Sequence, residues 1–123
     1  MKKLFLACLM MLAGSAWAEW VMYFESDVAT HYFDPATIRK DGHIRRVWAL
    51  QELRKRNKDG EMSRRMRYEH NCKQERYRIL FYTFHSESMA GGEILATGGE
   101  DNNWLEIPPA TASEEMLKIV CAK

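Results

Sequence analysis

Residues 68–72 read Y-E-H-N-C and place Cys72 two positions after His70. A thiolate beside an imidazole is the nucleophile of many cysteine enzymes, and the same two groups are common zinc ligands. In an exported protein, a cysteine instead pairs by default into a disulfide. The residue types alone therefore leave three roles for Cys72: nucleophile, metal ligand or half of a disulfide.

The amino-terminal residues favour the third role. Residues 1–18 combine two lysines, an apolar run and a final Ala-Trp-Ala, which is the pattern of a cleavable export signal. The apolar run is shorter than the ~20 residues that span a bilayer, and Cys8 lies too early in it to make a good lipidation site. We expect cleavage between Ala18 and Glu19, a mature domain of residues 19–123 without a transmembrane segment, and a periplasmic, secreted or cell-surface location.

Removal of the signal leaves two of the three cysteines, Cys72 and Cys121. Only one intramolecular pair is then available, so we expect these two residues to form a disulfide. The competing roles have less support. Two residues that share a strand face at this spacing lie about 7 Å apart, and the four histidines have no zinc-site spacing. We expect no catalytic residue, no metal site and no cofactor.

Turn dipeptides divide the mature chain into strands. Asp34-Pro35, Asp41-Gly42 and the run Asn-Lys-Asp-Gly at 57–60 are typical of tight turns. Between them lie short runs rich in aromatic and β-branched residues or alternating in polarity. Six strands are predicted, at 20–25, 29–33, 43–56, 66–72, 76–84 and 93–97. Gly91-Gly92 and Gly98-Gly99 are predicted to be turns on either side of the last one.

The period of two assigns the strand faces. Tyr68, His70 and Cys72 share one face with Met66, whereas residues 67, 69 and 71 are predicted to face water. Residues 76–84 are apolar on both faces after Arg78, which predicts a central strand.

The last element is predicted to be a helix. Residues 111–114 read T-A-S-E and match a capping box, and Leu117, Val120 and Cys121 then fall on one helical face. The fold class is therefore α+β: an antiparallel sheet of about six strands with a carboxy-terminal α-helix packed on one face and tied by Cys72–Cys121.

Charge is unevenly distributed along the chain. Residues 39–78 carry 14 Lys and Arg against 6 Asp and Glu, whereas both flanks are acidic. Six cations lie around one predicted hairpin: Arg54, Lys55, Arg56, Arg64, Arg65 and Arg67. They could bind an anionic glycan or an acidic protein, or they are the solvated end of a hairpin that nearby acids neutralise. The chain has no nucleic-acid motif, so no nucleic-acid partner is expected.

Several short motifs together resemble a known family. They are Trp20, Y-F-D-P-A-T-I at 32–38, R-V-W-A-L at 46–50, Cys72 with Arg76 and Arg78, Trp104 with I-P-P, and V-C at 120–121. In order and spacing they resemble the surface-adhesin protein E family across the whole mature chain.

The resemblance implies a small exported bacterial protein with an antiparallel sheet, a disulfide-tied helix, a homodimer and no catalytic motif. It also implies a non-enzymatic adhesin that binds extracellular-matrix or plasma proteins of a host. The alternative is a periplasmic envelope protein that binds a small molecule, a glycan or a partner protein. Only the cysteine pair is carried over residue by residue.

Overall fold

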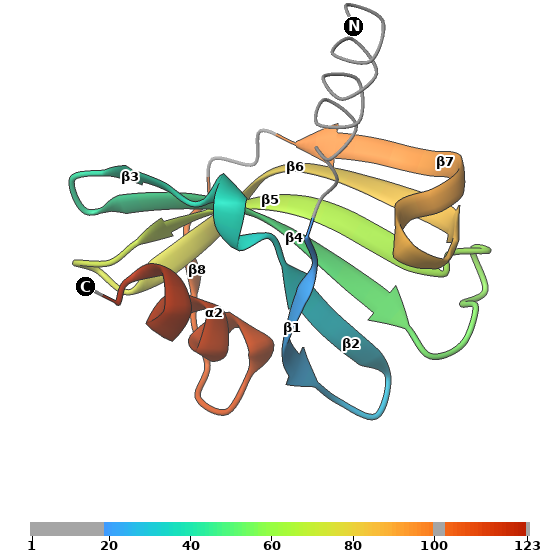
Figure 1. Cartoon of the computed structure of the whole chain (residues 1–123), viewed down its shortest axis with the longest axis horizontal. Helices are drawn as coiled ribbons and strands as arrows, with labels where there is room; N and C mark the ends of the chain where they lie inside the picture. Colours follow the sequence, from blue (N-terminus) through green and yellow to red (C-terminus); the bar gives the residue numbers. More distant parts are fainter. Residues whose placement is uncertain (1–18, 100–102, 123) are drawn as a thin grey trace, which may run out of the picture.

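The chain folds into one antiparallel sheet that arches over a carboxy-terminal helix (Figure 1). The computed structural model describes residues 19–99 and 103–122, so the predicted signal and its cleavage site at Ala18 lie outside the described residues. The elements are β1 Val21–Glu25, β2 Ala29–Phe33, η1 Pro35–Thr37, β3 Arg39–Asp41, β4 Ile44–Leu53, β5 Ser63–Asn71, β6 Arg76–Glu87, η2 Ser88–Ala90, β7 Gly91–Gly99, β8 Leu105–Glu106 and α2 Ala112–Val120. The predicted α+β class is confirmed.

The described part of the sheet has eight strands, not six. The main path runs β1-β2-β4-β5-β6-β7, and these strands are the six that the sequence predicts. The two additional strands are short: β3 pairs with β4, and β8 pairs with β6. With three and two residues, β3 and β8 are too short to show an alternating pattern, which explains why they were not predicted.

Two expectations about the last long strands are wrong. β6 is second from an edge of the sheet and not central. The face of β6 that carries Phe81 is not covered, and Phe81 is 42% exposed. The glycine pairs lie inside β7, which spans Gly91–Gly99, and are not turns beside it. A Cβ at Gly98 would lie 2.3 Å from the ring of Tyr82, so glycine here permits close approach to β6.

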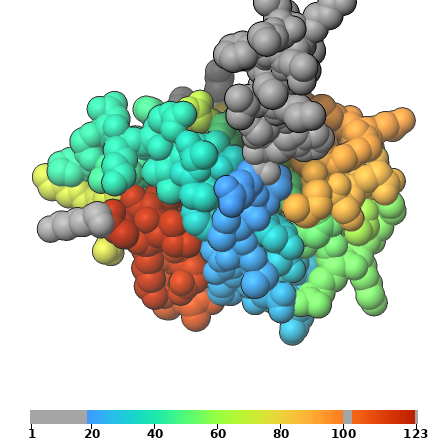
Figure 2. All heavy atoms as spheres, viewed as in Figure 1, coloured from blue at the N-terminus to red at the C-terminus, as the bar shows by residue number. Residues whose placement is uncertain are grey.

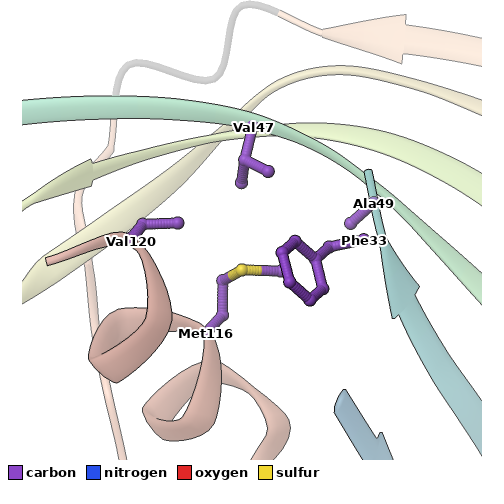
Figure 3. Packing of buried hydrophobic residues seen from close by; sticks show 5 residues of the cluster. All are labelled: Phe33, Val47, Ala49, Met116 and Val120. Carbon is purple, nitrogen blue, oxygen red and sulfur yellow. The ribbon is translucent and has the colours of Figure 1, made fainter. Parts of the chain in front are cut away.

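The apolar core lies between the sheet and α2. Figure 3 shows Phe33, Val47 and Ala49 from the sheet meeting Met116 and Val120 from the helix, and all five are buried. The spacing of four residues puts Met116 and Val120 on one helical face. Met116 is almost completely buried at the centre of this face.

Both ends of α2 are fixed by specific contacts. At its start the Thr111 hydroxyl accepts a hydrogen bond from the Glu114 backbone N–H at 3.3 Å, which is half of the predicted capping box. At its end Cys121 is bonded to Cys72, with 5.7 Å between the Cα atoms, as the sequence predicts. The side chain of Arg45 also donates to the carbonyl of Val120 at 3.1 Å. The helix packs against β1 and β4, and the space-filling view shows it beside the amino-terminal strands (red against blue, Figure 2).

Candidate functional site

The sheet surface opposite α2, here called the outer face, carries a cluster of aromatic and basic side chains. Because Val47 and Ala49 pack toward the helix, the alternate residue Trp48 points to the outer face. The strand register places Arg67 directly opposite Trp48 and Phe81 directly opposite Arg67. Three neighbouring strands thus contribute to one surface.

Arg65 completes this cluster from the same strand as Arg67. Its guanidinium carbon lies 4.4 Å from the centre of the Trp48 ring, and the edge of Trp48 meets Phe81 at 6.2 Å between ring centroids. When a guanidinium stacks on an aromatic ring, its N–H groups lie in a plane parallel to the ring. They can therefore still donate hydrogen bonds to an acceptor at the edge of the stack. Arg65 is exposed, so its outward edge is accessible to a partner.

Glu69 lies on the same face but is buried, with 3% of its surface exposed. The prediction that it faces water is wrong, because the register puts an arginine on each side of it. Arg46 approaches one carboxylate oxygen at 2.8 Å and Arg78 the other at 2.6 Å. The guanidinium of Arg78 also lies 4.4 Å from the Trp104 ring centre.

Only some of the arginines on the outer face are therefore paired with a carboxylate. Glu69 is shared by Arg46 and Arg78, whereas no ion pair joins Arg65 or Arg67 to a carboxylate within the described residues. Two cations on a rigid strand, beside exposed aromatic surface, are a suitable receptor for carboxylate, sulfate or phosphate groups.

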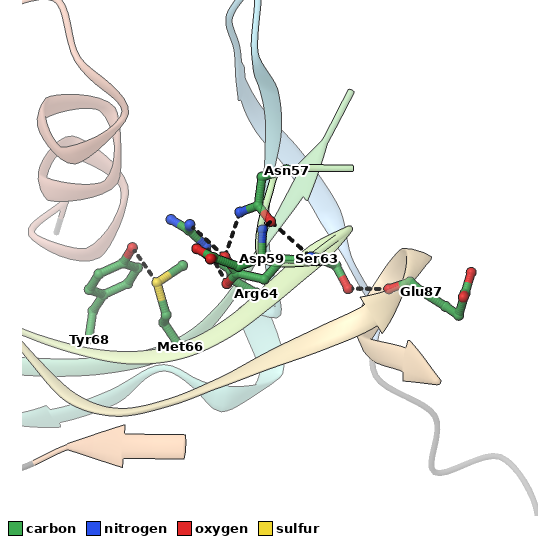
Figure 4. Close-up of polar contacts among 8 residues, drawn as sticks. Asn57, Asp59, Ser63, Arg64, Met66, Tyr68 and Glu87 are labelled. Carbon is green, nitrogen blue, oxygen red and sulfur yellow. Dashed lines mark hydrogen bonds and ion pairs between the residues drawn. The ribbon is translucent and has the colours of Figure 1, made fainter. Parts of the chain in front are cut away.

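The hairpin cations have different surroundings. Arg64 lies on the helix side of the sheet, where it contacts the Glu61 carboxylate at 3.1 and 3.2 Å and lies 4.7 Å from the Phe84 ring centre. Asn57 also donates to Glu61, at 2.5 Å, and Figure 4 shows the side chains of Arg64 and Asn57 close to one another. Burial raises the pKa of Glu61, but the hydrogen bonds from Arg64 and Asn57 and the charge of Arg64 outweigh it, so the net shift lowers the pKa.

Arg54 and Arg56 also have acidic partners. Arg54 lies 3.5 Å from Glu25, and Arg56 lies 3.5 Å from Glu87 and donates to the carbonyls of Gly60 and Ser86. Lys55 is exposed and lines, with Arg54, Arg56 and Arg64, a surface groove of about 610 Å³.

The structure thus divides the six predicted cations into two groups. The first group surrounds the hairpin groove and consists of Arg54, Lys55, Arg56 and Arg64. Each of its three arginines forms an ion pair with a carboxylate. Arg65 and Arg67 lie on the outer face without such partners. Sequence reasoning grouped all six because they are close in the chain, but neighbours on a strand point to opposite faces.

Sequence reasoning missed a second site, a cavity of about 60 Å³ under the start of α2. Its walls include Tyr23, His31, Tyr68, His70, Tyr77 and Met116. His70 is 1% exposed, and its Nδ1 has no hydrogen-bond partner within the described residues. These residues belong to five different elements, so their only sequence signal was the shared face of Tyr68 and His70.

The disulfide decides the question raised by the Y-E-H-N-C stretch. Because both sulfur atoms are bonded to each other, neither Cys72 nor Cys121 is a thiolate nucleophile or a metal ligand in this structure. The described residues contain no group of three or more His, Cys, Asp or Glu side chains that could hold a metal ion. Within the same residues, no helix has the length and apolar content needed to cross a membrane.

A single antiparallel sheet whose terminal helix is held by one disulfide defines a small α+β domain. The chain belongs to the surface-adhesin protein E family, whose model matches residues 20–122. No curated protein matches the chain.

The chain is similar in fold to solved structures of protein E from Haemophilus influenzae. One crystal form has a TM-score of 0.59 at 18% sequence identity, covering 87% of this chain and 97% of that one. The protein E structure from non-typeable Haemophilus influenzae has a TM-score of 0.56 at 18% identity, covering 89% and 79% of the two chains. At this identity the likeness establishes the fold and not the ligand.

Proposed function

We propose that this chain is an exported, non-enzymatic bacterial binding protein of adhesin type, which contacts acidic segments of partner proteins through its outer face. Membership of the surface-adhesin family supports the class. The observation that carries the proposal is the pair Arg65 and Arg67 beside Trp48, of which Arg65 is exposed and Arg67 half-buried, and neither has an acidic partner in the described structure. In this proposal the signal is cleaved after Ala18, and the protein acts without a cofactor.

Charge complementarity favours an acidic partner. Trp48 already has Arg65 stacked on it, so the group offered outward is the guanidinium edge and not the indole face. Arg65 and Arg67 are two residues apart on one strand, which places their Cα atoms about 7 Å apart. In an extended peptide, acidic residues at alternate positions have the same spacing, so each could face one arginine. Arginine and tryptophan are also the residues that most often dominate binding energy at protein interfaces.

The test measures binding of the oxidised chain 19–123 to a panel of purified extracellular-matrix and plasma proteins, with heparin as a sulfated-glycan probe. Replacing Arg65→Gln and Arg67→Gln together should weaken binding to a panel protein by about tenfold or more. The matched control, Arg54→Gln with Arg56→Gln, removes the same charge from the hairpin and should bind like wild type. Binding should weaken from about 0.01 M to 1 M salt, as the screening length falls from about 30 to 3 Å.

Three results would contradict this proposal. Loss of binding only in the hairpin variant would assign the site to Arg54, Lys55, Arg56 and Arg64. Preference for heparin would assign a glycan partner. Binding to no panel protein would remove the adhesin role and leave the alternative, a periplasmic envelope protein with a glycan, small-molecule or protein partner. Sedimentation of the same samples tests the homodimer that the family resemblance implies.

A further inference from the structure

The cavity of about 60 Å³ lined by Tyr23, His31, Tyr68, His70, Tyr77 and Met116, here called the Tyr–His cavity, lies between the first turn of α2 and the sheet. Ala112, Ser113 and Met116 border it from the helix, and the aromatic residues border it from the sheet. A volume near 10–15 Å³ in this measure admits one water molecule. The 60 Å³ found here therefore corresponds to roughly four to six water molecules, or to one compact molecule of similar size.

Its aromatic wall is ordered by ring contacts. His70 stacks on Tyr77 with 5.9 Å between ring centroids and an angle of 25°. Tyr68 meets both rings edge-on, at 6.0 and 5.8 Å, and Tyr23 meets His31 at 6.0 Å. Rings packed in this way hold their polar atoms in place before a ligand arrives, which reduces the entropy lost on binding.

The hydrogen-bonding capacity of this wall is only partly used by the protein. Only 1% of the surface of His70 is exposed, and its Nδ1 has no hydrogen-bond partner in the described structure. The Tyr68 hydroxyl donates to the sulfur of Met66 at 3.3 Å, which is a weak acceptor. Buried polar atoms nearly always have partners, because an unpartnered one loses its hydration without compensation. A guest that bonds to the imidazole of His70 or to the Tyr68 hydroxyl would use this capacity.

The lining determines the charge of that guest. None of the residues named carries a formal charge, because burial lowers the pKa of both His70 and His31 and keeps them neutral at pH 7. Burial also raises the pKa of Tyr23 and Tyr68, so their hydroxyls keep their protons. The helix start favours an anion, but Glu114 and Glu115 in the same turn oppose it. A charged guest would lose its hydration without a counter-charge.

We propose that the Tyr–His cavity binds a small uncharged molecule, of about four to six non-hydrogen atoms, that both donates and accepts hydrogen bonds, such as a short polyol or an amide. Neutral imidazole and phenol groups each offer a donor and an acceptor, which suits hydroxyl and amide groups alike. The cavity is on the helix side of the sheet, so this site is separate from the outer face and does not depend on the function proposed above.

The test is an NMR titration of the oxidised chain 19–123, which follows the imidazole signals of His70 and the ring signals of Tyr77. The probes are glycerol and acetamide, with acetate and methylammonium as charged counterparts of similar size. At least one neutral probe should give saturable shifts at both residues, and the charged probes should give none. Charged probes that bind as tightly as the neutral ones, or neutral probes that never saturate, would overturn the proposal.

Two variants test whether the binding occurs in this cavity. His70→Phe keeps a ring on Tyr77 but removes the imidazole hydrogen bond, so the dissociation constant should rise about tenfold. Ala112→Met places a larger side chain at the cavity wall and should abolish binding. If His70→Phe does not fold, Tyr77→Phe removes one hydroxyl while keeping the stack. The Arg65→Gln, Arg67→Gln variant should bind the probe like wild type. Unchanged affinity in the cavity variants would overturn the proposal.

Discussion

Neighbouring residues on β5 show two ways to bury a polar side chain. Glu69 is buried on the outer face, where Arg46 and Arg78 both contact its carboxylate. His70 points to the helix side, where rings and not carboxylates surround it, and burial lowers its pKa to about 4. A buried charge needs an opposite charge, whereas a buried imidazole can simply remain neutral.

The lowered pKa of His70 predicts a loss of stability in mild acid. Between pH 4 and 6.5 the unfolded state binds more protons than the folded state, so the free energy of unfolding rises with pH in this range and levels off above it. From pH 7 to pH 5 the loss from His70 is roughly 2 kcal/mol. Urea unfolding at the two pH values measures it.

His70→Phe is the matched variant for this prediction, because phenylalanine cannot be protonated. It should lose less stability than wild type between pH 7 and 5. A remaining slope is expected from His31 and His85, whose pKa values burial also lowers. If the free energy of unfolding depended on pH equally in wild type and variant, the pKa of His70 would not be lowered in the folded state.

At the scale of the element, α2 depends on its contacts. A helix of nine residues is too short to be stable alone in water. Its stability in the fold comes from the Thr111 cap, the burial of Met116 and Val120, and the bond at Cys121. The same helix closes the Tyr–His cavity, so its docking also shapes that site.

Thr111→Ala should lower the free energy of unfolding by about 1 kcal/mol, because the Glu114 N–H then loses its capping acceptor. Thr111→Ser keeps a hydroxyl at the cap and should remain close to wild type. Chemical denaturation of the three proteins provides the comparison. Equal stability of the alanine and serine variants would mean that the cap contributes nothing.

At the scale of the whole molecule, the disulfide joins the sheet to the chain end across 49 residues. On the chain-entropy model, a loop of this length restricts the unfolded state enough to contribute about 4 kcal/mol to stability. This is a large part of the ~5–15 kcal/mol that stabilises a typical domain.

The double variant Cys72→Ser, Cys121→Ser should therefore unfold at a much lower urea concentration than the oxidised protein, with a loss of about 4 kcal/mol. Wild type that has been reduced and alkylated should show a similar loss. A difference below about 1 kcal/mol would mean that the unfolded chain is already restricted by other contacts.

The two faces of the sheet have separate environments. α2 covers one face and encloses neutral polar groups, and the other face exposes arginines and aromatic rings. A partner on the outer face and a small guest under the helix would not compete for the same residues.

Local features of the sequence determined much of this fold. The six long strands follow from alternation and turn dipeptides, and the start of α2 follows from its capping residues. The pairing of Cys72 with Cys121 follows from the cysteine count once Cys8 is set aside with the predicted export signal. Each of these signals lies within a few residues or depends only on composition, so it can be read without knowing which strands are neighbours.

Only the tertiary structure decided the remaining features. The burial of Glu69, the position of Arg67 between Trp48 and Phe81, and the Tyr–His cavity all depend on strand register. Register brings together residues that are far apart in the chain, and the position of α2 decides which face is covered. Neither is encoded in a local pattern, because a one-residue shift in pairing would send each side chain to the opposite face.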